Sequence, residues 1–114
     1  MAMIATGASA QSAPWADKVL YDRRIENIEH GDYTAARLAL NTLINMYATS
    51  EYQAWAKLAI AVSWLREGDA QALPQAEAQY RDFIRFYPDM KEAAELQVGE
   101  PLRKIREHEA TTPR

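Results

Sequence analysis

Apolar residues recur at three- and four-residue spacing through most of the chain, which is the period of an amphipathic helix. The clearest run, Tyr52 to Gly68, carries apolar side chains on nearly every side, so we expect it to be a helix buried between others. Ser50 with Gln53 predicts a capping box at its start, and Gly68 with Asp69 predicts its end. One face of this helix holds Trp55, Leu58 and Val62, and the other, which we expect in the core, holds Ile60 and Trp64.

Four further helices follow from the same spacing and from their start and stop signals, so the fold class is all-α with five helices and no strand. The first predicted helix begins near Ser12 or Pro14 and ends at about His30. The second is capped by Asp32 and continues to Tyr47, and the fourth is opened by Pro74 and continues to Tyr87. The last begins with the pair Asp89 and Glu92, is interrupted at Gly99 and Pro101, and continues to about His108.

The second helix matches the fourth when the sequence is shifted by forty residues. Ala36 then pairs with Ala76, Leu40 with Tyr80, Ile44 with Ile84, and Tyr47 with Tyr87. Gly31-Asp32 and Gly68-Asp69 end the first and third helices in the same way. A helix, a turn, a helix and a turn at a period of about 37 to 40 residues predict a helical-hairpin α-solenoid of about two and a half repeats.

These positions resemble the tetratricopeptide repeat (TPR), whose small, aromatic, glycine and proline positions are matched by Ala61, Trp64, Gly68, Ala76, Tyr80 and Pro88. Arg24 and Asn27 depart from that pattern in the first unit, as an end repeat facing water allows. More closely, Gly31-Asp32-Tyr33-x-x-Ala36 and Tyr80-x-x-Phe83-Ile84-x-x-Tyr87-Pro88 are similar to the first repeats of the BamD family of outer-membrane assembly factors, over about Ala16 to Val98. The resemblance implies a protein-binding scaffold of outer-membrane protein assembly. A cell-envelope coordinator resembling the TPR part of CpoB and a cytoplasmic TPR adaptor are the alternatives.

We expect one TPR-like domain over residues 14–109. Residues 1–13 are uncharged and rich in small residues, with Ala8-Ser9-Ala10 in the pattern of a signal-peptidase site, so both a signal-peptide remnant and a flexible leader stay open. Residues 110–114 are expected to form a disordered tail. By resemblance the location is the periplasm or cell envelope, with the cytoplasm as the alternative, and the sequence has no cysteine to carry a lipid.

Composition argues against several function classes. Thirteen basic and sixteen acidic residues give a net charge of -3, which does not favour nucleic-acid binding. The chain has no cysteine, and its two histidines, His30 and His108, are not at ligand spacing, so we expect no metal or other cofactor. We find no nucleophile motif, phosphate loop or paired-carboxylate cleft, and we therefore expect neither an enzyme nor a small-molecule substrate.

The first helix of each hairpin lines the concave side of such a stack, which predicts a peptide-binding groove of Tyr21, Ile25, Trp55, Leu58, Val62 and Arg66. This groove is apolar and offers mainly Lys18 and Arg66 to a terminal carboxylate, so we expect it to bind an extended or helical apolar peptide rather than a carboxylate. The alternative is that another helix or a partner subunit covers these residues. A homodimer therefore stays open.

Overall fold

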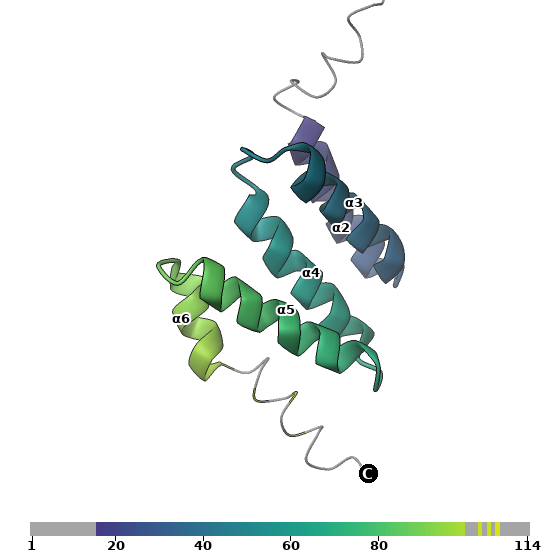
Figure 1. Cartoon of the computed structure of the whole chain (residues 1–114). Helices are drawn as coiled ribbons and strands as arrows, with labels where there is room; N and C mark the ends of the chain where they lie inside the picture. Colours follow the sequence, from purple (N-terminus) through teal and green to yellow (C-terminus); the bar gives the residue numbers. More distant parts are fainter. Residues whose placement is uncertain (1–15, 100–102, 104, 106, 108–114) are drawn as a thin grey trace, which may run out of the picture. The chain divides into compact units, whose positions relative to one another are not determined.

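The computed structural model describes residues 16–99 together with Arg103, Ile105 and Glu107. In this part of the chain all regular structure is α-helical, in the five helices α2 to α6 (Figure 1), which confirms the predicted all-α class and its five helices. The leader predicted over residues 1–13 and the tail predicted over residues 110–114 lie outside the described residues. The chain divides into two compact units, residues 1–56 and 57–114.

The first unit is built on an antiparallel hairpin of α2 (Ala16–Glu29) and α3 (Tyr33–Met46) (Figure 1). Gly31 makes the turn at a φ of +76°, a left-handed backbone conformation that suits glycine because it has no Cβ. Asp32 then caps α3, since its Oδ1 accepts the N–H of Ala35 at 3.1 Å. Both signals act as the sequence predicts.

The core of the first unit comes mainly from α3. Ala36, Leu40 and Leu43 are completely buried, at the four- and three-residue spacing of one helical stripe. Every residue of α2 is half-buried or exposed, and none is fully buried. The hairpin therefore has one well-buried helix and one helix that keeps much of its surface accessible.

The turn into α4 (Gln53–Glu67) differs from the predicted capping box. The Ser50 hydroxyl accepts the N–H of Tyr52 at 3.0 Å, and the Ser50 N–H donates to the carbonyl of Tyr47 at 2.9 Å. The side-chain amide of Gln53 instead donates to the carbonyls of Ile44 and Tyr47, at 3.0 and 2.8 Å. The capping-box prediction was wrong because Gln53 satisfies the free carbonyls at the end of α3 rather than an N–H at the start of its own helix.

The second unit continues α4 from Lys57 and adds α5 (Ala72–Phe86) and α6 (Lys91–Val98). Gly68 has a φ of +73°, and the Asp69 carboxylate accepts the N–H groups of Gln71 and Ala72 at 3.0 and 2.7 Å. α5 begins at Ala72, two residues before the predicted start at Pro74; its N-cap residue is Gln71, whose side chain makes no capping bond, so Asp69 supplies the acceptor for the first N–H. The proline lies in the first turn, where a missing N–H costs no intrahelical bond.

Alanines and two aromatic residues fill the core of the second unit. Ala61 and Ala76 are completely buried, and Tyr80 and Phe83 are 2% and 1% exposed. Ile60 is buried as predicted, whereas Trp64, expected in the core, is only half-buried. The buried Ser63 hydroxyl donates to the Ile60 carbonyl at 2.6 Å, so its polar group is satisfied within the helix.

α6 begins after Met90, whose side chain makes no capping hydrogen bond, and Glu92 lies in its first turn, so the helix starts where the pair Asp89 and Glu92 predicts. The Met90 carbonyl instead accepts the N–H of Ala93 at 3.0 Å. α6 ends at Gly99, as the sequence predicts, and Arg103, Ile105 and Glu107 beyond it are again helical, with Ile105 completely buried. Among the described residues, no helix is long and apolar enough to cross a bilayer.

Candidate protein-binding surface

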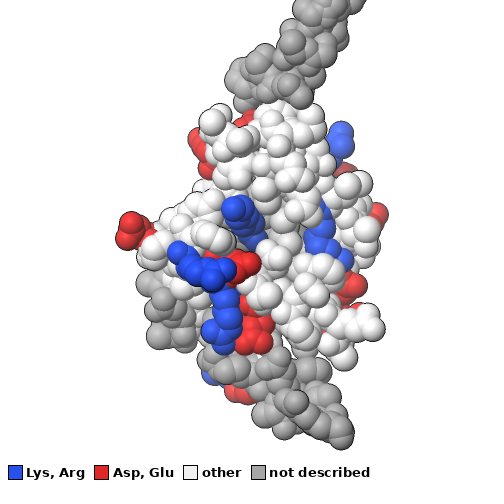
Figure 2. Space-filling view, viewed as in Figure 1, with Lys and Arg blue, Asp and Glu red and all other residues white. Residues whose placement is uncertain are grey.

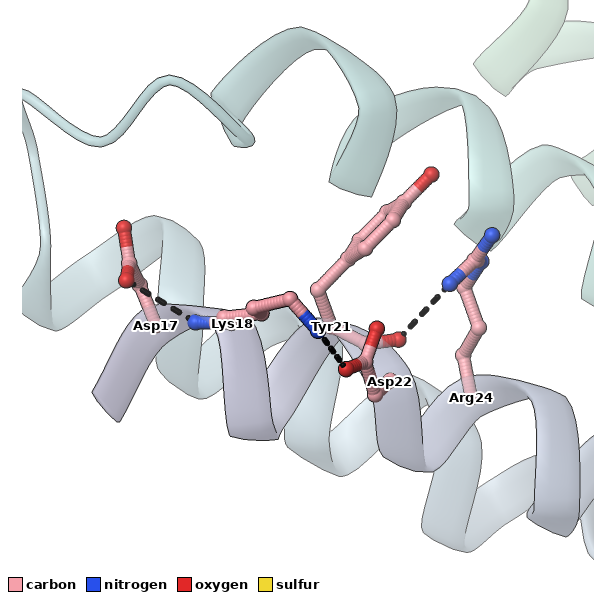
Figure 3. A network of polar contacts seen from close by, with 5 residues as sticks. All are labelled: Asp17, Lys18, Tyr21, Asp22 and Arg24. Carbon is pink, nitrogen blue, oxygen red and sulfur yellow. Dashed lines mark hydrogen bonds and ion pairs between the residues drawn. The ribbon is translucent and has the colours of Figure 1, made fainter. Parts of the chain in front are cut away.

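Tyr21 is the best-anchored residue of the predicted groove. Its half-buried ring stacks on Tyr52, with the centroids 4.9 Å apart and the planes at 24°. The guanidinium carbon of Arg24 lies 3.6 Å from the centre of the Tyr21 ring, and Arg24 Nη1 donates to the Tyr21 carbonyl at 2.9 Å (Figure 3). Stacking and the cation–π contact hold the ring in one orientation. The pKa of Tyr21 is raised, chiefly by partial burial, with the Arg24 charge acting in the opposite direction.

Lys18 lies one turn before Tyr21 and is engaged with a carboxylate. Its Nζ is 2.6 Å from Asp22 Oδ2, and its backbone N–H donates to Asp17 Oδ1 at 2.8 Å (Figure 3). The hydrogen bond to Asp22 raises the pKa of the Lys18 ammonium, so the group stays charged while its charge is already compensated. This pairing fits the expectation that the groove does not clamp a peptide carboxylate.

The start of α2 is tied to the turn before α4. The Ser50 hydroxyl donates to Asp17 Oδ2, and the same hydroxyl accepts the Tyr52 N–H. One serine thus connects the first turn of α2 to the segment that carries Tyr52, the residue that stacks on Tyr21. The segments that carry Tyr21 and Tyr52 are therefore joined by a hydrogen bond in addition to the ring stacking.

Ile25 and Trp55 are the accessible apolar members of the predicted groove in the first unit. Ile25, one turn after Tyr21 on α2, is 49% exposed, and Trp55, in the first turn of α4, is 36% exposed. Neither residue is ordinary core of its unit.

The remaining three groove residues belong to the second unit. Leu58 and Val62 are half-buried and Arg66 is exposed in the last turn of α4. They continue the three- and four-residue spacing of Trp55 and so follow one face of α4. The assembly of all six residues into one groove stays a prediction.

Sequence reasoning missed two residues of this surface. The sequence pattern marks Tyr52 only as the start of a helix and Arg24 only as a departure from the repeat, yet both contact the ring of Tyr21. The signal available was that Tyr52 lies between Ser50 and Gln53, before the first turn of α4, where its side chain can turn toward another helix. A further missed residue is Leu38, an apolar side chain outside the core stripe that is 69% exposed.

Charges on the surface are mixed in sign. On the face shown in Figure 2, acidic and basic side chains are interspersed among uncharged residues. The described ion pairs are exposed contacts within one helix, such as Arg81 with Glu77 and Arg103 with Glu107, both at 2.8 Å. The described residues hold no group of three or more histidine, aspartate or glutamate side chains that could bind a metal ion.

The comparison with protein families gives one match. The family model YfiO, described as an outer membrane lipoprotein family, matches residues 15–97, which is most of the chain. The chain belongs to the YfiO family. This family is BamD-like and built on TPRs, so the resemblance inferred from the repeat positions is confirmed. No curated protein and no solved structure gave a match.

Membership in the YfiO family sets the general character of the chain. Proteins of this TPR type generally act as scaffolds that bind other proteins and are generally not enzymes. The family description refers to the outer membrane, which suggests a location in the cell envelope. The packed helical hairpins described above are the framework on which such a binding surface is built.

Proposed function

We propose that this YfiO-family chain is a scaffold of outer-membrane protein assembly, located in the periplasm or at the cell envelope. The observation that carries the proposal is the family match over residues 15–97, in combination with accessible apolar residues on the helices expected to line the concave side. Its partner is a protein, bound as an extended or helical apolar segment. The binding site is the predicted groove of Tyr21, Ile25, Trp55, Leu58, Val62 and Arg66.

The chemistry of the groove suits the strands of outer-membrane proteins before they insert. Such strands alternate apolar and polar residues and carry aromatic residues near the membrane surfaces. An extended segment of that kind presents one apolar edge, which the exposed faces of Ile25 and Trp55 complement. The Tyr21–Tyr52 pair supplies a rigid aromatic surface at low entropic cost, because its rings are already held in place before a partner arrives.

Arg66 lies at the far end of the α4 face and is the exposed basic residue of the last helical turn. It would contact the polar edge or a carbonyl of the bound segment and so set its direction. Lys18 does not serve this purpose, since its charge is compensated by Asp22.

The test is a titration of the full chain with a synthetic peptide of about ten residues that alternates apolar and polar positions and ends in an aromatic residue. Trp55→Ala should weaken binding by about tenfold or more, because buried aromatic residues dominate interface energy at roughly 2 kcal/mol or more each. Phe86→Ala is the matched control, since Phe86 is more exposed than Trp55, at 59%, but lies on α5 outside the predicted groove. The control should bind as the unchanged chain does.

Equal binding by the unchanged chain and Trp55→Ala would reject the groove. A circular dichroism melt of Trp55→Ala separates loss of binding from loss of fold, because a purely structural tryptophan would lower the melting temperature as well. Cell fractionation tests the location separately: recovery of the native protein only from the cytosol would reject a role at the envelope.

A further inference from the structure

An open groove with a volume of about 690 Å³ lies between α2 and α3 of the first unit. α2 lines it with Leu20, Arg23, Glu26 and Asn27, and α3 lines it with Ala35, Leu38, Ala39 and Thr42. Tyr21 and Ile25 of the predicted peptide groove do not line it. It is therefore a second surface, and its role is independent of the proposed function.

The α3 side of this groove combines small residues with one protruding apolar side chain. Ala35 is half-buried and Ala39 is 9% exposed, whereas Leu38 between them is 69% exposed. Small residues allow a neighbouring helix to approach closely. The protruding Leu38 side chain can be buried only if the partner surface has a pocket of matching size. Leu38 does not contribute to the core stripe of α3, which is Ala36, Leu40 and Leu43.

The location of the groove fits the open side of a helical hairpin. One hairpin buries its apolar surface by stacking on another, and exposed Leu38 leaves an apolar part of this groove accessible. A second copy of the same hairpin presents the same groove and can cover it. We propose that the groove is where two copies of this chain associate, through a twofold-symmetric contact of their α2–α3 hairpins.

The charges at the groove are compatible with a twofold contact. Such a contact uses the same patch on both copies, so the patch must be complementary to itself. Arg23 and Glu26 are both exposed and bring one positive and one negative charge to the same helix. A patch of this composition neither repels a copy of itself nor favours a partner of one charge sign.

The geometry of the hairpin places these charges and Leu38 at one level. Because the chain reverses at Gly31, positions seven residues before and seven residues after it, Arg24 and Leu38, are at about the same height along the hairpin. Arg23 and Glu26 lie on either side of that height. A twofold axis there brings each Arg23 opposite Glu26 of the second copy and lays the two Leu38 side chains against each other.

Analytical ultracentrifugation of the full chain up to about 1 mM tests the proposal, over a range in which even weak association is measurable. We expect a monomer–dimer equilibrium. Leu38→Lys should lower the association constant by at least about tenfold, since each substitution acts twice in a symmetric contact. Phe86→Lys, a change of the same kind at an exposed aromatic residue of the second unit, should leave the constant unchanged.

The charge pair gives the sharper test of symmetry. Arg23→Glu and Glu26→Arg should each weaken association, because each places two like charges opposite each other, and the double variant Arg23→Glu with Glu26→Arg should restore it. Circular dichroism should be unchanged in all of these variants, because the three residues are exposed. Failure of the double variant to restore association would overturn the twofold arrangement.

A chain that stays monomeric at the highest concentration would overturn the proposal outright. If in that monomer a cysteine introduced by Leu38→Cys reacted slowly with a maleimide, the groove would be covered by another part of the same chain, and the second copy would again be rejected. Dimerisation that Leu38→Lys does not change would place the contact on a different surface and would equally overturn the proposal.

Discussion

The two Gly-Asp turns begin alike and lead to hairpins of different character. Gly31 and Gly68 share a left-handed φ, and the carboxylates of Asp32 and Asp69 each accept an N–H in the first turn of the helix that follows. In the helix before each turn, however, the first unit has Arg24 where the second has Ala61. Ala61 is completely buried, whereas Arg24 lies over the ring of Tyr21 at the surface of its helix.

This difference shows how one repeat pattern serves two purposes. The small residue at position 61 lets helices of the second unit pack closely around Tyr80 and Phe83, which makes that unit the tightly packed one. The arginine at position 24 lies instead over an aromatic ring, one residue before accessible Ile25. The first unit is therefore better suited to present a surface, and the second to supply stability.

The largest loss of stability is expected from a substitution at Phe83, which is 1% exposed in the second unit. Phe83→Ala should lower the free energy of unfolding by about 3 to 5 kcal/mol, because it removes a buried ring and leaves a cavity. The control is Phe86→Ala on the same helix, where the ring is 59% exposed and the expected loss is below about 1 kcal/mol. Urea titration measures both, and equal losses would mean that the second unit is not the tightly packed one.

A second prediction uses the pH dependence of stability. Burial raises the pKa of Tyr80 from 10.0 to about 12. Below pH 10 the phenol is neutral in both states; between about pH 10 and 12 only the unfolded chain loses the proton, so stability falls by roughly 2 to 3 kcal/mol across that window. In urea titrations, Tyr80→Phe should remove this part of the alkaline loss, whereas Tyr33→Phe, on the half-buried start of α3, should retain it.

The same alkaline decline in Tyr80→Phe and in the unchanged chain would show that the Tyr80 phenol contacts solvent in the folded protein. The other tyrosines and the lysines contribute an alkaline loss of stability that is common to Tyr80→Phe and the unchanged chain. The contribution of Tyr80 is therefore the difference between their two curves of stability against pH.

The smallest effect is expected at the pair of positions that distinguishes the two hairpins. Ala61→Leu should cost about 1 to 3 kcal/mol by overpacking a site without free space. Arg24→Leu in the first unit should cost less than about 1 kcal/mol, because it loses only a cation–π contact and one hydrogen bond near the surface. Thermal melting ranks the two, and a larger loss at Arg24 would reverse the assignment of the packed and open hairpins.

Sequence reasoning predicted the helices well because their signals are local. Three- and four-residue spacing and two glycines with an aspartate after each were enough for α2 to α5, and Gly99 ends α6 as expected. The errors lie where a side chain had several partners to choose from. Gln53 was expected to cap its own helix but donates to α3, and Asp69 accepts the N–H of Ala72, so that α5 begins two residues before the predicted Pro74.

The site was harder to predict, because accessibility depends on which side chains pack together. Position along a helix indicated that Trp55 and Ile25 differ from the core, and both are accessible. It also placed Trp64 in the core, but the Trp64 side chain is only half-buried. Leu38 is exposed, whereas Leu40, a leucine only two residues further along α3, is buried. Residue type alone could therefore not reveal the groove that Leu38 lines.

The hydrogen bonds of the Gln53 side chain also affect how the ends of α3 and α4 open locally. Helix ends normally fray one residue at a time, so their amide protons exchange with solvent fastest. Here one amide group spans the last carbonyls of α3 and the first turn of α4, at 3.0 and 2.8 Å. The two ends have to open in a single event, and the amide protons between Tyr47 and Gln53 should therefore exchange at one shared rate instead of a graded series.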